Sequence, residues 1–585
     1  MTPTVTSHAL PLNPGIFSTL SEALDYASTG ETGCNFYSGR GKLAHVLPYK
    51  ELQSQAKSLA KRLNSLKLHR GSRVALVADT TPDFIRFFFA CQYAGLIPVP
   101  LPISLHLGGH QAYVTQLRRL LESCRPSVAM APEGLVPYLE EAAKGLQLSL
   151  LGGPEIFASL PVIDEDLSPL ATHELAYIQY TSGSTRWPRG VEVTQSAVMT
   201  NLAGIIQNGL QVKEGDRCVS WLPFYHDMGL VGFVLGPMAS QLSVDYLSTR
   251  DFAMRPRQWL SLMTKSQATI SFSPSFGYEL CVRRLGEDSP EQFDLSHWRI
   301  AGVGAETIRA DSLLRFASTL GPSGFKQEAF LACYGMAECS LAISFAPLSQ
   351  GLDVDRVDGD WLSNEREALP ISSSLTSEDD STRCSSFVNC GVPLPGYEVE
   401  IRDSRGSTLG TRKSGTIFVR GASIMSGYFN DPVTTHEVLS SDGWLNTGDI
   451  GYWVKDSLVI IGRSKDMIII NGRNIWPQDL EFLAEQQPEV RPGDSSAFSV
   501  SGPDGEEMAV MVIQCRESEP QKREELVKRL RALVYQELSI PCFIELIPPR
   551  SLPRTSSGKL SRSRAKTDFL SRVHWDVLAP MLSAS

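Results

Sequence analysis

The sequence predicts an α/β protein with more than one domain, and three observations support this fold class. Strand-like and helical runs alternate through the N-terminal half, which is typical of parallel sheets wrapped by helices. Alternating strands with turn residues follow residue 397 and predict a small β-barrel. Residues 467–585 contain strands and an apolar helical stripe of their own, which predict a small α+β C-terminal domain. A chain of 585 residues also exceeds what one hydrophobic core normally supports.

The first elements of the chain form a βαβ unit. Residues 19–22 read TLSE, a capping box that predicts the start of a helix. A strand over 73–78, a helix over 82–95 with proline at its start and glycine at its end, and a strand over 97–101 follow. Residues 114–130 repeat the alternation of helix and strand. We therefore expect the large N-terminal region to contain two subdomains of this helix-wrapped βαβ type.

Composition argues against several classes of function. The chain is 42% hydrophobic and 20% charged, as in ordinary globular proteins, and its formal charge of −10 argues against a nucleic-acid partner. The longest apolar stretch, residues 84–100, is interrupted by Arg86 and Gln92, so no stable membrane insertion is expected. The first thirty residues do not have the pattern of a secretory signal. The 11 scattered cysteines, Cys333 and Cys339 among them, predict buried, reduced thiols in a cytoplasmic protein.

A loop rich in small and hydroxyl residues follows the apolar run 176–180. Residues 181–191 read TSGSTRWPRGV, and the backbone N–H groups and hydroxyls of such a loop can converge on an anion. Arg186 and Arg189 add positive charge beside it. The Walker pattern requires a lysine where this chain has Val191, and the dinucleotide glycine pattern is absent. Composition alone favours an ordinary turn, so a phosphate site depends on the motifs that follow.

Three later strand-like runs end in polar or glycine-rich segments. His226 and Asp227 precede glycines and apolar residues, and so place a polar group at the mouth of an apolar channel; the alternative is a helix start at which His226 binds backbone. Residues 302–306 form a glycine-rich turn. Residues 330–338 supply an aromatic, a glycine and the carboxylate of Glu338, which by itself is more often a helix cap. Because open α/β sheets bind ligands at the carboxyl ends of their strands, we expect these segments to lie together.

The remainder of the chain adds two candidates and an insertion. Asp449 lies in a Thr-Gly-Asp turn, followed by GRSKD at 462–466. Lys559 lies in the turn PRTSSGK, where the plain interpretation is a solvated lysine near a basic tail. Residues 351–387 are acidic and then polar, with low complexity, and are interpreted as an insertion.

In this order, the motifs resemble those of the adenylate-forming enzymes, the superfamily of acyl-CoA synthetases, luciferases and peptide-synthetase adenylation domains. The loop S-G-S-T-R-x-P-R-G, the stretch L-P-x-x-H-D-M-G-L and the insertion resemble the fatty acyl-AMP ligases within it. The loop departs from the usual superfamily form at Arg186 and Arg189. Ala337 replaces a usual threonine, which removes one phosphate contact. The resemblance covers nearly the whole chain.

The resemblance implies a role for each motif, with ATP and Mg²⁺ as cofactors. The residues implied in nucleotide binding are Thr181, Ser182, Gly183, Ser184, Thr185, Arg189, Gly304, Ala305, Glu306, Cys333, Tyr334, Gly335, Met336, Ala337, Asp449 and Arg463. The implied catalytic residues are Lys559, His226 and Glu338, of which Glu338 would bind Mg²⁺ and Lys559 would pair with the acyl carboxylate and the α-phosphate. The residues expected to bind the acid are His226, Asp227, Met228, Gly229, Phe233, Phe276 and Tyr278. Such aromatic residues are more often part of a core.

The resemblance also implies an organisation and a reaction. Residues 1–463 would form the adenylating domain, 464–466 a hinge containing Lys465, and 467–585 a mobile lid, while the insertion would disfavour reaction with CoA. A fatty acid and ATP would give acyl-AMP and pyrophosphate, and the acyl group would pass to the phosphopantetheine thiol of a separate acyl carrier protein. The alternatives are a medium- or long-chain acyl-CoA synthetase and a non-catalytic nucleotide-binding protein on the same fold.

Overall fold

The computed structural model describes residues 10–103, 109–181, 189–285, 290–371, 383–470, 473–501, 507–555 and 559–573. Residues 182–188, which include most of the expected phosphate loop, lie outside the described residues. The first helix, α1 (Leu20–Ala27), begins as the capping box predicted: the Thr19 hydroxyl accepts a hydrogen bond from the Glu22 N–H (3.2 Å). The Glu22 carboxylate accepts from the Ser18 N–H (2.8 Å).

A four-stranded parallel sheet, in the order β4-β3-β5-β6, follows. Its strands are β3 (Arg73–Val77), β4 (Ile97–Leu101), β5 (Val128–Met130) and β6 (Leu150–Gly152). Its connecting and neighbouring helices are α2 (Tyr49–Asn64), α3 (Pro82–Ala94), α4 (His110–Cys124), α5 (Val136–Ala142) and α6 (Pro154–Ala158). Helix α3 has proline in its first turn and ends at Gly95 in the left-handed conformation, φ 69°, as its sequence predicts. The predicted βαβ unit is therefore confirmed.

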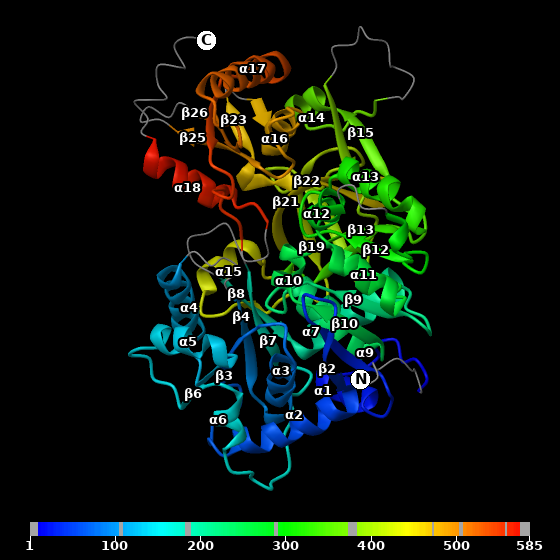
Figure 1. The fold of residues 1–585 in the computed structure, drawn as a ribbon, viewed down its shortest axis with the longest axis vertical. Helices are drawn as coiled ribbons and strands as arrows, with labels where there is room; N and C mark the ends of the chain where they lie inside the picture. Colours follow the sequence, from blue (N-terminus) through cyan, green and yellow to red (C-terminus); the bar gives the residue numbers. More distant parts are fainter. Residues whose placement is uncertain are drawn as a thin grey trace.

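A nine-stranded mixed sheet forms the centre of the molecule (Figure 1), in the order β17-β14-β13-β12-β11-β9-β10-β1-β2. Its parallel strands are β1 (Gly33–Tyr37), β9 (Arg217–Ser220), β10 (Ser243–Leu247), β11 (Ile270–Ser273), β12 (Ile300–Val303) and β13 (Phe330–Gly335). Its antiparallel edge strands are β2 (Leu43–Pro48), β14 (Ala342–Phe345) and β17 (Val392–Pro393). Because six neighbouring strands run parallel, their carboxyl ends meet at one edge, where ligands of such sheets bind.

Helices flank this sheet. They are α7 (Gln195–Gly204), α8 (Asp227–Leu230), α9 (Gly236–Ala239), α10 (Thr249–Met254), α11 (Arg257–Ser266), α12 (Ser275–Leu285) and α13 (Ala310–Leu320). Two π-helical segments interrupt this set, η2 (Ile205–Gly209) after α7 and η3 (Val231–Leu235) between α8 and α9. Such wide turns recur at functional sites, and both segments line the cavity described below.

Smaller antiparallel sheets complete the N-terminal part. β7 (Leu175–Thr181), β8 (Arg189–Thr194) and β20 (Gly427–Tyr428) form a three-stranded sheet. β18 (Glu398–Arg402), β19 (Gly415–Arg420), β21 (Leu445–Val454) and β22 (Ser457–Arg463) form a four-stranded sheet. The helix α15 (Pro432–Val438) lies between β20 and β21 in the chain. Over the described residues, β18 and β22 are the two ends of this sheet. The unit is therefore an open sheet and not the closed β-barrel that the sequence predicted.

The C-terminal part lies at the top of Figure 1 and has two cores of its own. Its elements are β23 (Ile468–Ile470), β24 (Arg473–Ile475), α16 (Pro477–Glu485), β25 (Ser495–Ser501), β26 (Glu507–Gln514), α17 (Pro520–Leu538), β27 (Cys542–Ile547) and α18 (Arg562–Arg572). Alternate residues of β26 face opposite ways: Met511 belongs to the core with α16 and α17, and Val510 to the core with α18. This is the α+β arrangement that the sequence predicted.

The state of the cysteines is the one that their scattered positions predicted. All 11 cysteines are free, and all are buried except Cys333, which is half-buried, and Cys384, which is exposed. Within the described ranges, no helix has both the length and the apolar character needed to cross a membrane.

Candidate active site

The His226–Asp227 pair lies where the chain leaves β9 and enters α8. His226 is the residue before the helix, in extended conformation, and its Nδ1 contacts Asp227 Oδ1. The same carboxylate oxygen accepts a hydrogen bond from the Met228 N–H (2.7 Å). Gly229 has to be glycine, because a Cβ there would lie 2.1 Å from the Pro223 carbonyl oxygen. Burial opposes ionisation of Asp227, but His226 and Lys559 together lower the pKa of this carboxyl below its ordinary value.

The glycine-rich turn after β12 lies against β13. A Cβ on Gly304 would lie 2.7 Å from the Cys333 carbonyl oxygen, so only glycine permits this close approach. Ala305 adopts the left-handed conformation, φ 69°. The Glu306 carboxylate accepts a hydrogen bond from the Phe276 N–H (3.2 Å) and so joins the turn to α12.

Tyr334 and Asp449 are buried beside this turn, and the more exposed Arg463 contacts Asp449. The Tyr334 hydroxyl donates to Asp449 Oδ2 (2.6 Å), and Arg463 Nε lies 3.2 Å from Asp449 Oδ1. Asp449 and Arg463 are paired residues of β21 and β22, so the antiparallel register brings them together. Burial and the Asp449 carboxylate raise the pKa of Tyr334, which keeps its hydroxyl protonated and able to donate.

Glu338 lies just beyond β13, in the short 3₁₀ turn Ala337–Cys339. Its side chain is buried, and Oε1 accepts a hydrogen bond from the Tyr428 hydroxyl (2.7 Å). Burial raises the pKa of Glu338, and the Tyr428 hydrogen bond opposes that shift. Tyr428 was not among the residues expected at the site. Its position in the sequence, in a two-residue strand that pairs with β8, gave no signal of this contact.

The two ends of the expected phosphate loop lie next to this glutamate. Thr181 ends β7 and Arg189 begins β8, and the two residues are paired across the hairpin. The Arg189 guanidinium lies 5.4 Å from the centre of the Tyr428 ring. Ser182, Gly183, Ser184 and Thr185 lie outside the described residues. The base of the loop is thus adjacent, through Tyr428, to Glu338.

Lys559 reaches the same site from the C-terminal part. Its turn is closed by two backbone hydrogen bonds, from the Thr555 N–H to the Lys559 carbonyl (2.7 Å) and from the Ser561 N–H to the Pro553 carbonyl (3.0 Å). Burial lowers the pKa of Lys559, the nearby carboxylates of Asp227 and Glu306 raise it, and Arg463 lowers it, with a net decrease. The charge of Lys559 therefore interacts with one residue after β9, one residue after β12 and the last residue of β22.

Lys465 lies at the start of the C-terminal part, in the 3₁₀ turn Ser464–Asp466. One serine separates Lys465 from Arg463. Burial and the Arg463 charge lower the pKa of Lys465. The turn joins β22 of the N-terminal part to β23 of the C-terminal part, which is the position expected for a hinge.

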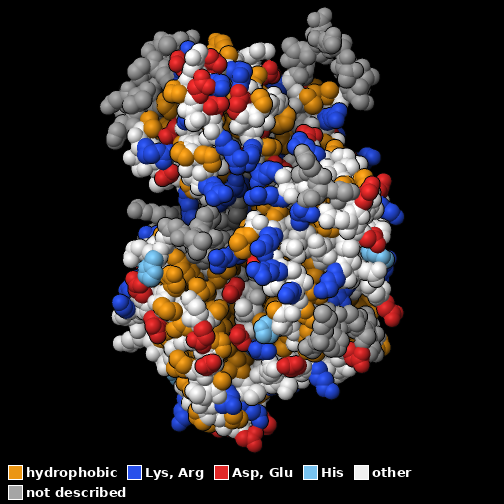
Figure 2. Space-filling model, viewed as in Figure 1, with side chains coloured by type: hydrophobic (Ala, Val, Ile, Leu, Met, Phe, Trp, Pro, Cys, Tyr) orange, Lys and Arg blue, Asp and Glu red, His pale blue; other side chains and the backbone are white. Residues whose placement is uncertain are grey.

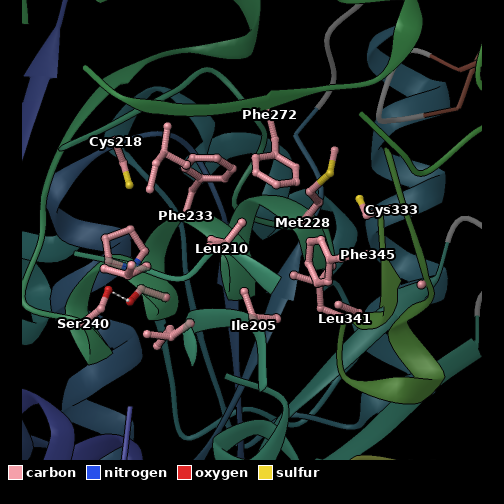
Figure 3. Close-up of a pocket in the computed structure, with 18 of the residues that line it drawn as sticks. Ile205, Leu210, Cys218, Met228, Phe233, Ser240, Phe272, Cys333, Leu341 and Phe345 are labelled. Atoms are coloured by element: carbon pink, nitrogen blue, oxygen red, sulfur yellow. Dashed lines mark hydrogen bonds between the residues drawn. The ribbon is translucent and has the colours of Figure 1, made fainter. Parts of the chain in front are cut away.

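An apolar tunnel leads from this polar site into the centre of the molecule (Figure 3). It contains about 780 Å³ of empty space, part of it open to solvent. Asp227, Ala305 and Tyr334 lie at its polar end, and apolar side chains from both π-helical segments line its interior. The labelled residues of Figure 3 are Ile205, Leu210, Cys218, Met228, Phe233, Ser240, Phe272, Cys333, Leu341 and Phe345.

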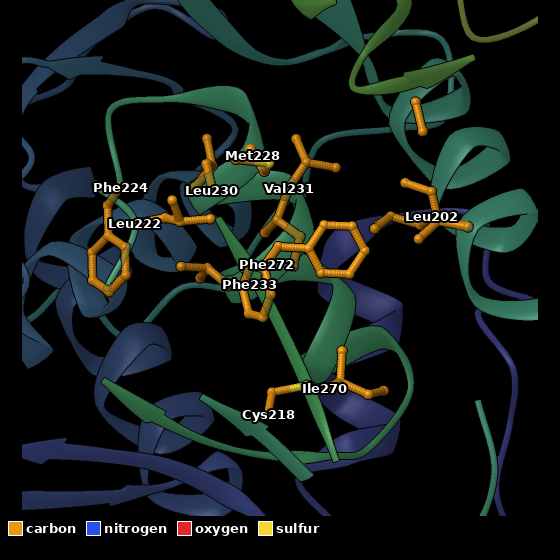
Figure 4. Close-up of a cluster of buried hydrophobic side chains, with 14 of the residues drawn as sticks. Leu202, Cys218, Leu222, Phe224, Met228, Leu230, Val231, Phe233, Ile270 and Phe272 are labelled. Atoms are coloured by element: carbon orange, nitrogen blue, oxygen red, sulfur yellow. The ribbon is translucent and has the colours of Figure 1, made fainter. Parts of the chain in front are cut away.

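Of the residues expected to bind the acid, Asp227, Met228 and Phe233 line the tunnel, and Figure 4 shows Met228 and Phe233 in the surrounding cluster of buried side chains. His226 and Gly229 are the chain neighbours of Asp227 and Met228 but are not among the lining residues. Tyr278 does not line it: its ring is fully buried against Trp259 and other aromatic rings, and its hydroxyl donates to the Gly302 carbonyl (2.8 Å). Phe276 packs on Trp221, also outside the lining. The expectation for these two aromatic residues is corrected, because they face the core.

Comparisons with known proteins agree with this geometry. The family model of AMP-binding enzymes matches residues 41–429. A Caulobacter vibrioides protein with the provisional name acyl-CoA synthetase is 44% identical over 96% of this chain and 96% of its own. The medium-chain fatty acid acyl-carrier-protein ligase JamA of Moorena producens is 31% identical over 97% of this chain and 98% of its own.

A solved structure is also similar to this chain. It comes from a study of fatty acyl-adenylate ligases from E. coli and L. pneumophila, is 45% identical, and covers 96% of this chain and 99% of its own, with a TM-score of 0.90. A match of this length and identity extends the likeness through both the N-terminal and the C-terminal parts. The chain therefore belongs to the AMP-binding enzymes and is an adenylate-forming enzyme of the fatty acyl-adenylate ligase type.

Proposed function

We propose that this enzyme activates a fatty acid with ATP, giving acyl-AMP and pyrophosphate, and passes the acyl group to the phosphopantetheine thiol of an acyl carrier protein. The observation that carries the proposal is the apolar tunnel that opens between Asp227 and Tyr334, directly at a site rich in ionic groups. An aliphatic chain suits the tunnel, and its carboxylate would then lie at the mouth, near Lys559. The relatives that act on fatty acids support the same choice of substrate.

The chemistry asks mainly for positioning and for control of charge. A carboxylate oxygen attacks the α-phosphorus of ATP, the bond to the β-phosphate oxygen breaks, and pyrophosphate leaves. Lys559 would pair with the acyl carboxylate and the α-phosphate oxygens; its charge interacts with those of Asp227 and Glu306, and Asp227 lines the tunnel at its polar end. Asp449 would accept hydrogen bonds from the ribose hydroxyls, Tyr334 would stack on adenine, and the loop 181–189 would hold the outer phosphates.

Glu338 fits a Mg²⁺ ligand. It is a buried carboxylate with one neutral hydrogen-bond donor, and a hard cation bound to phosphate needs only one or two such oxygens from the protein. Over the described residues, no group of three or more His, Cys, Asp or Glu side chains forms a metal cage, so the triphosphate would supply the other ligands. Bound Mg²⁺ would neutralise phosphate charge; Glu338 and Tyr428 would hold and orient the ligand oxygen.

The function is tested by one paired assay. The full-length protein is mixed with dodecanoic acid, ATP and Mg²⁺, and acyl-AMP is followed with and without CoA. Accumulation of acyl-AMP without thioester, and transfer to a carrier protein bearing phosphopantetheine, is the expected result. Abundant acyl-CoA would instead favour the acyl-CoA synthetase alternative, for which the Caulobacter relative is the supporting observation.

Contacts between the insertion and the C-terminal part support the proposal that this enzyme reacts poorly with CoA. β15 (Val354–Asp358), α14 (Gly359–Glu365) and β16 (Cys384–Val388) belong to it. Arg383 Nη1 lies 2.6 Å from Asp479 Oδ2 on α16, and Arg473 Nη2 lies 3.6 Å from Asp360. These contacts tie the insertion to the C-terminal part. If residues 464–466 act as a hinge and 467–585 as a lid, as we propose, the contacts oppose the rotation that a CoA reaction would need.

Arg383→Ala is expected to raise the ratio of acyl-CoA to acyl-AMP by about tenfold, because a hydrogen bond to a charged group contributes about 1.5 kcal/mol or more to the closed arrangement. The ratio is measured in the paired assay above. Lys413→Ala is the control: it removes an exposed ion pair to Glu367 (2.8 Å) that does not reach the C-terminal part. An equal ratio in all three proteins would contradict this role of Arg383.

Tyr428→Phe is expected to move the acid limb of the pH–rate profile to higher pH by about one unit. Glu338 has to be ionised to bind Mg²⁺, burial already raises its pKa, and the Tyr428 hydrogen bond opposes that increase. Loss of the bond, about 1.5 kcal/mol, therefore raises the pKa further. The phenylalanine ring keeps the contact with Arg189. Tyr452→Phe, which removes a tyrosine–carboxylate bond to Asp355 (2.6 Å) on another sheet, should leave the profile unchanged.

Figure 2 shows Lys and Arg side chains gathered where the C-terminal part meets the rest of the molecule. Burial and the charges of Arg516, Arg283 and Arg284 lower the pKa of Arg491, so this arginine of the C-terminal part is influenced by positive charges of both parts. Such a positive region supports an anionic partner such as a carrier protein. A cytoplasmic location remains part of the proposal.

A further inference from the structure

The apolar tunnel ends against Leu242, and a second cavity lies behind this side chain. The second cavity has about 940 Å³ of empty space, including open solvent, and its lining is polar, with Thr32, Arg217, Ser243 and Lys265 among its residues. Leu242 also lines the tunnel, and within the described chain it is the one residue common to both linings. One side chain therefore separates an apolar space from a polar one.

The direction of the strands shows that Leu242 is at the far end of the tunnel. Strands β9, β10 and β11 are parallel, and the polar site lies beyond the carboxyl end of β9, at Asp227. Leu242 directly precedes Ser243, the first residue of β10, and Ser243 pairs with Arg217, the first residue of β9. The tunnel thus runs along these strands to their amino ends, and Figure 3 shows Cys218 and Ser240 on the side opposite Cys333.

The backbone of Leu242 is fixed independently of its side chain. Its carbonyl oxygen accepts a hydrogen bond from the buried Tyr49 hydroxyl (2.9 Å), and its N–H donates to the Pro237 carbonyl (2.8 Å). The side chain is 2% exposed. Shortening the side chain should therefore open a passage between the cavities and leave the surrounding strands in place.

The second cavity is unsuited to the methyl end of an acyl chain. Its lining includes the charged side chains of Arg217 and Lys265 and the amide of Gln267. The Lys265 ammonium lies 5.1 Å from the centre of the Tyr37 ring at the same cavity. Groups of this kind bind water or a polar ligand group, whereas an alkyl end would displace the water that solvates them.

We propose that Leu242 sets the upper limit of acyl chain length by closing the tunnel against this polar cavity. The proposal rests on the proposed function, because it takes a fatty acid as the occupant of the tunnel. A chain that exceeds the tunnel has to displace Leu242 and place its methyl end in a cavity lined by charged and polar side chains. A terminal hydroxyl would suit that polar lining, but it meets Leu242 first.

The test compares wild type, Leu242→Ala and Leu242→Val in the full-length protein, with thermal unfolding measured for each. The kcat/KM for acyl-AMP formation is determined with octanoic, dodecanoic, hexadecanoic and ω-hydroxyhexadecanoic acids. We expect Leu242→Ala to raise the hexadecanoic-to-dodecanoic ratio about tenfold or more, since a single methylene in an apolar pocket changes kcat/KM by roughly that factor. Leu242→Val should give a smaller increase in the same direction. The ω-hydroxy acid should become a substrate comparable to hexadecanoic acid only in Leu242→Ala.

One control variant alters the lining of the polar cavity only. Gln267→Ala changes that cavity and not the tunnel, and it should not change the chain-length ratio. The proposal is overturned if both Leu242 variants keep the wild-type ratio while wild type is active, or if Gln267→Ala alters the ratio as strongly. Leu242→Val decides the question if Leu242→Ala does not fold. A wild-type protein that forms no acyl-AMP with any of the acids would overturn the proposed function as well.

Discussion

Replacing Lys559 by alanine is expected to slow acyl-adenylate formation about 10²–10³-fold, roughly 3–4 kcal/mol, with the fold intact. The backbone hydrogen bonds that close its turn do not involve the side chain, so the turn should survive. The ammonium group, in contrast, is the one positive charge that the C-terminal turn brings to Asp227 and Glu306 within the described residues. Pyrophosphate exchange measures the first step, and thermal unfolding measures the fold.

Lys528→Ala is the matched control for this substitution. Lys528 lies on α17, its side chain is exposed, and it pairs only with Glu524 on the same helix, so its loss should leave exchange unchanged. Wild-type exchange in Lys559→Ala would show that the charge is not needed.

The pKa of Lys559 also determines where the alkaline limb of the pH–rate profile is expected. Because burial lowers the pKa of Lys559, the protonated form, and with it the rate, is lost at lower pH than for an ordinary lysine.

Local signals in the sequence were sufficient for the first elements of the fold. Pro82 and Gly95 mark the two ends of α3 by their backbone chemistry, and Thr19 caps α1, so these predictions do not depend on the rest of the chain. Closure of the expected β-barrel depends on pairing between strands far apart in sequence. The alternation of residues in β18 and β22 indicates strands, but it does not say whether these two strands pair.

The candidate site shows the same difference between local and distant information. Asp449 and Arg463 were recognised from short motifs, and the register of β21 and β22 brings them together. Tyr428 was missed because its contact with Glu338 joins residues 90 positions apart, in a two-residue strand. Tyr278 and Phe233 look alike in sequence, since both are aromatic and follow a strand end. Only the structure shows that one lies in the aromatic core and the other in the tunnel.

The tunnel itself could not be predicted from the sequence. Its lining comes from several separate segments, and each reads as ordinary core because its residues are apolar. The π-helical turns at Ile205–Gly209 and Val231–Leu235 have no clear sequence signature, yet both open toward the tunnel.

Asp449→Asn is expected to lower kcat/KM for ATP about 10²-fold or more. The carboxylate has two oxygens, and in the structure they contact the Tyr334 hydroxyl (2.6 Å) and Arg463 (3.2 Å). If Asp449 also binds both ribose hydroxyls, the loss of its charge weakens two hydrogen bonds, each contributing about 1.5 kcal/mol or more. Initial rates of acyl-AMP formation over a range of ATP concentrations measure the effect. Asp442→Asn, an exposed position before the same strand, is the control and should have no effect.

A nucleotide that lacks a ribose hydroxyl separates this role from a structural one. With wild type, 2′-deoxy-ATP should be a poorer substrate than ATP by about tenfold, the equivalent of one lost hydrogen bond to a charged group. With Asp449→Asn the two nucleotides should become nearly equal, because the partner of the missing hydroxyl is already impaired. If the variant still prefers ATP by the wild-type factor, Asp449 does not contact the ribose. Its loss would then act only through Tyr334 and Arg463, and thermal unfolding would detect that change.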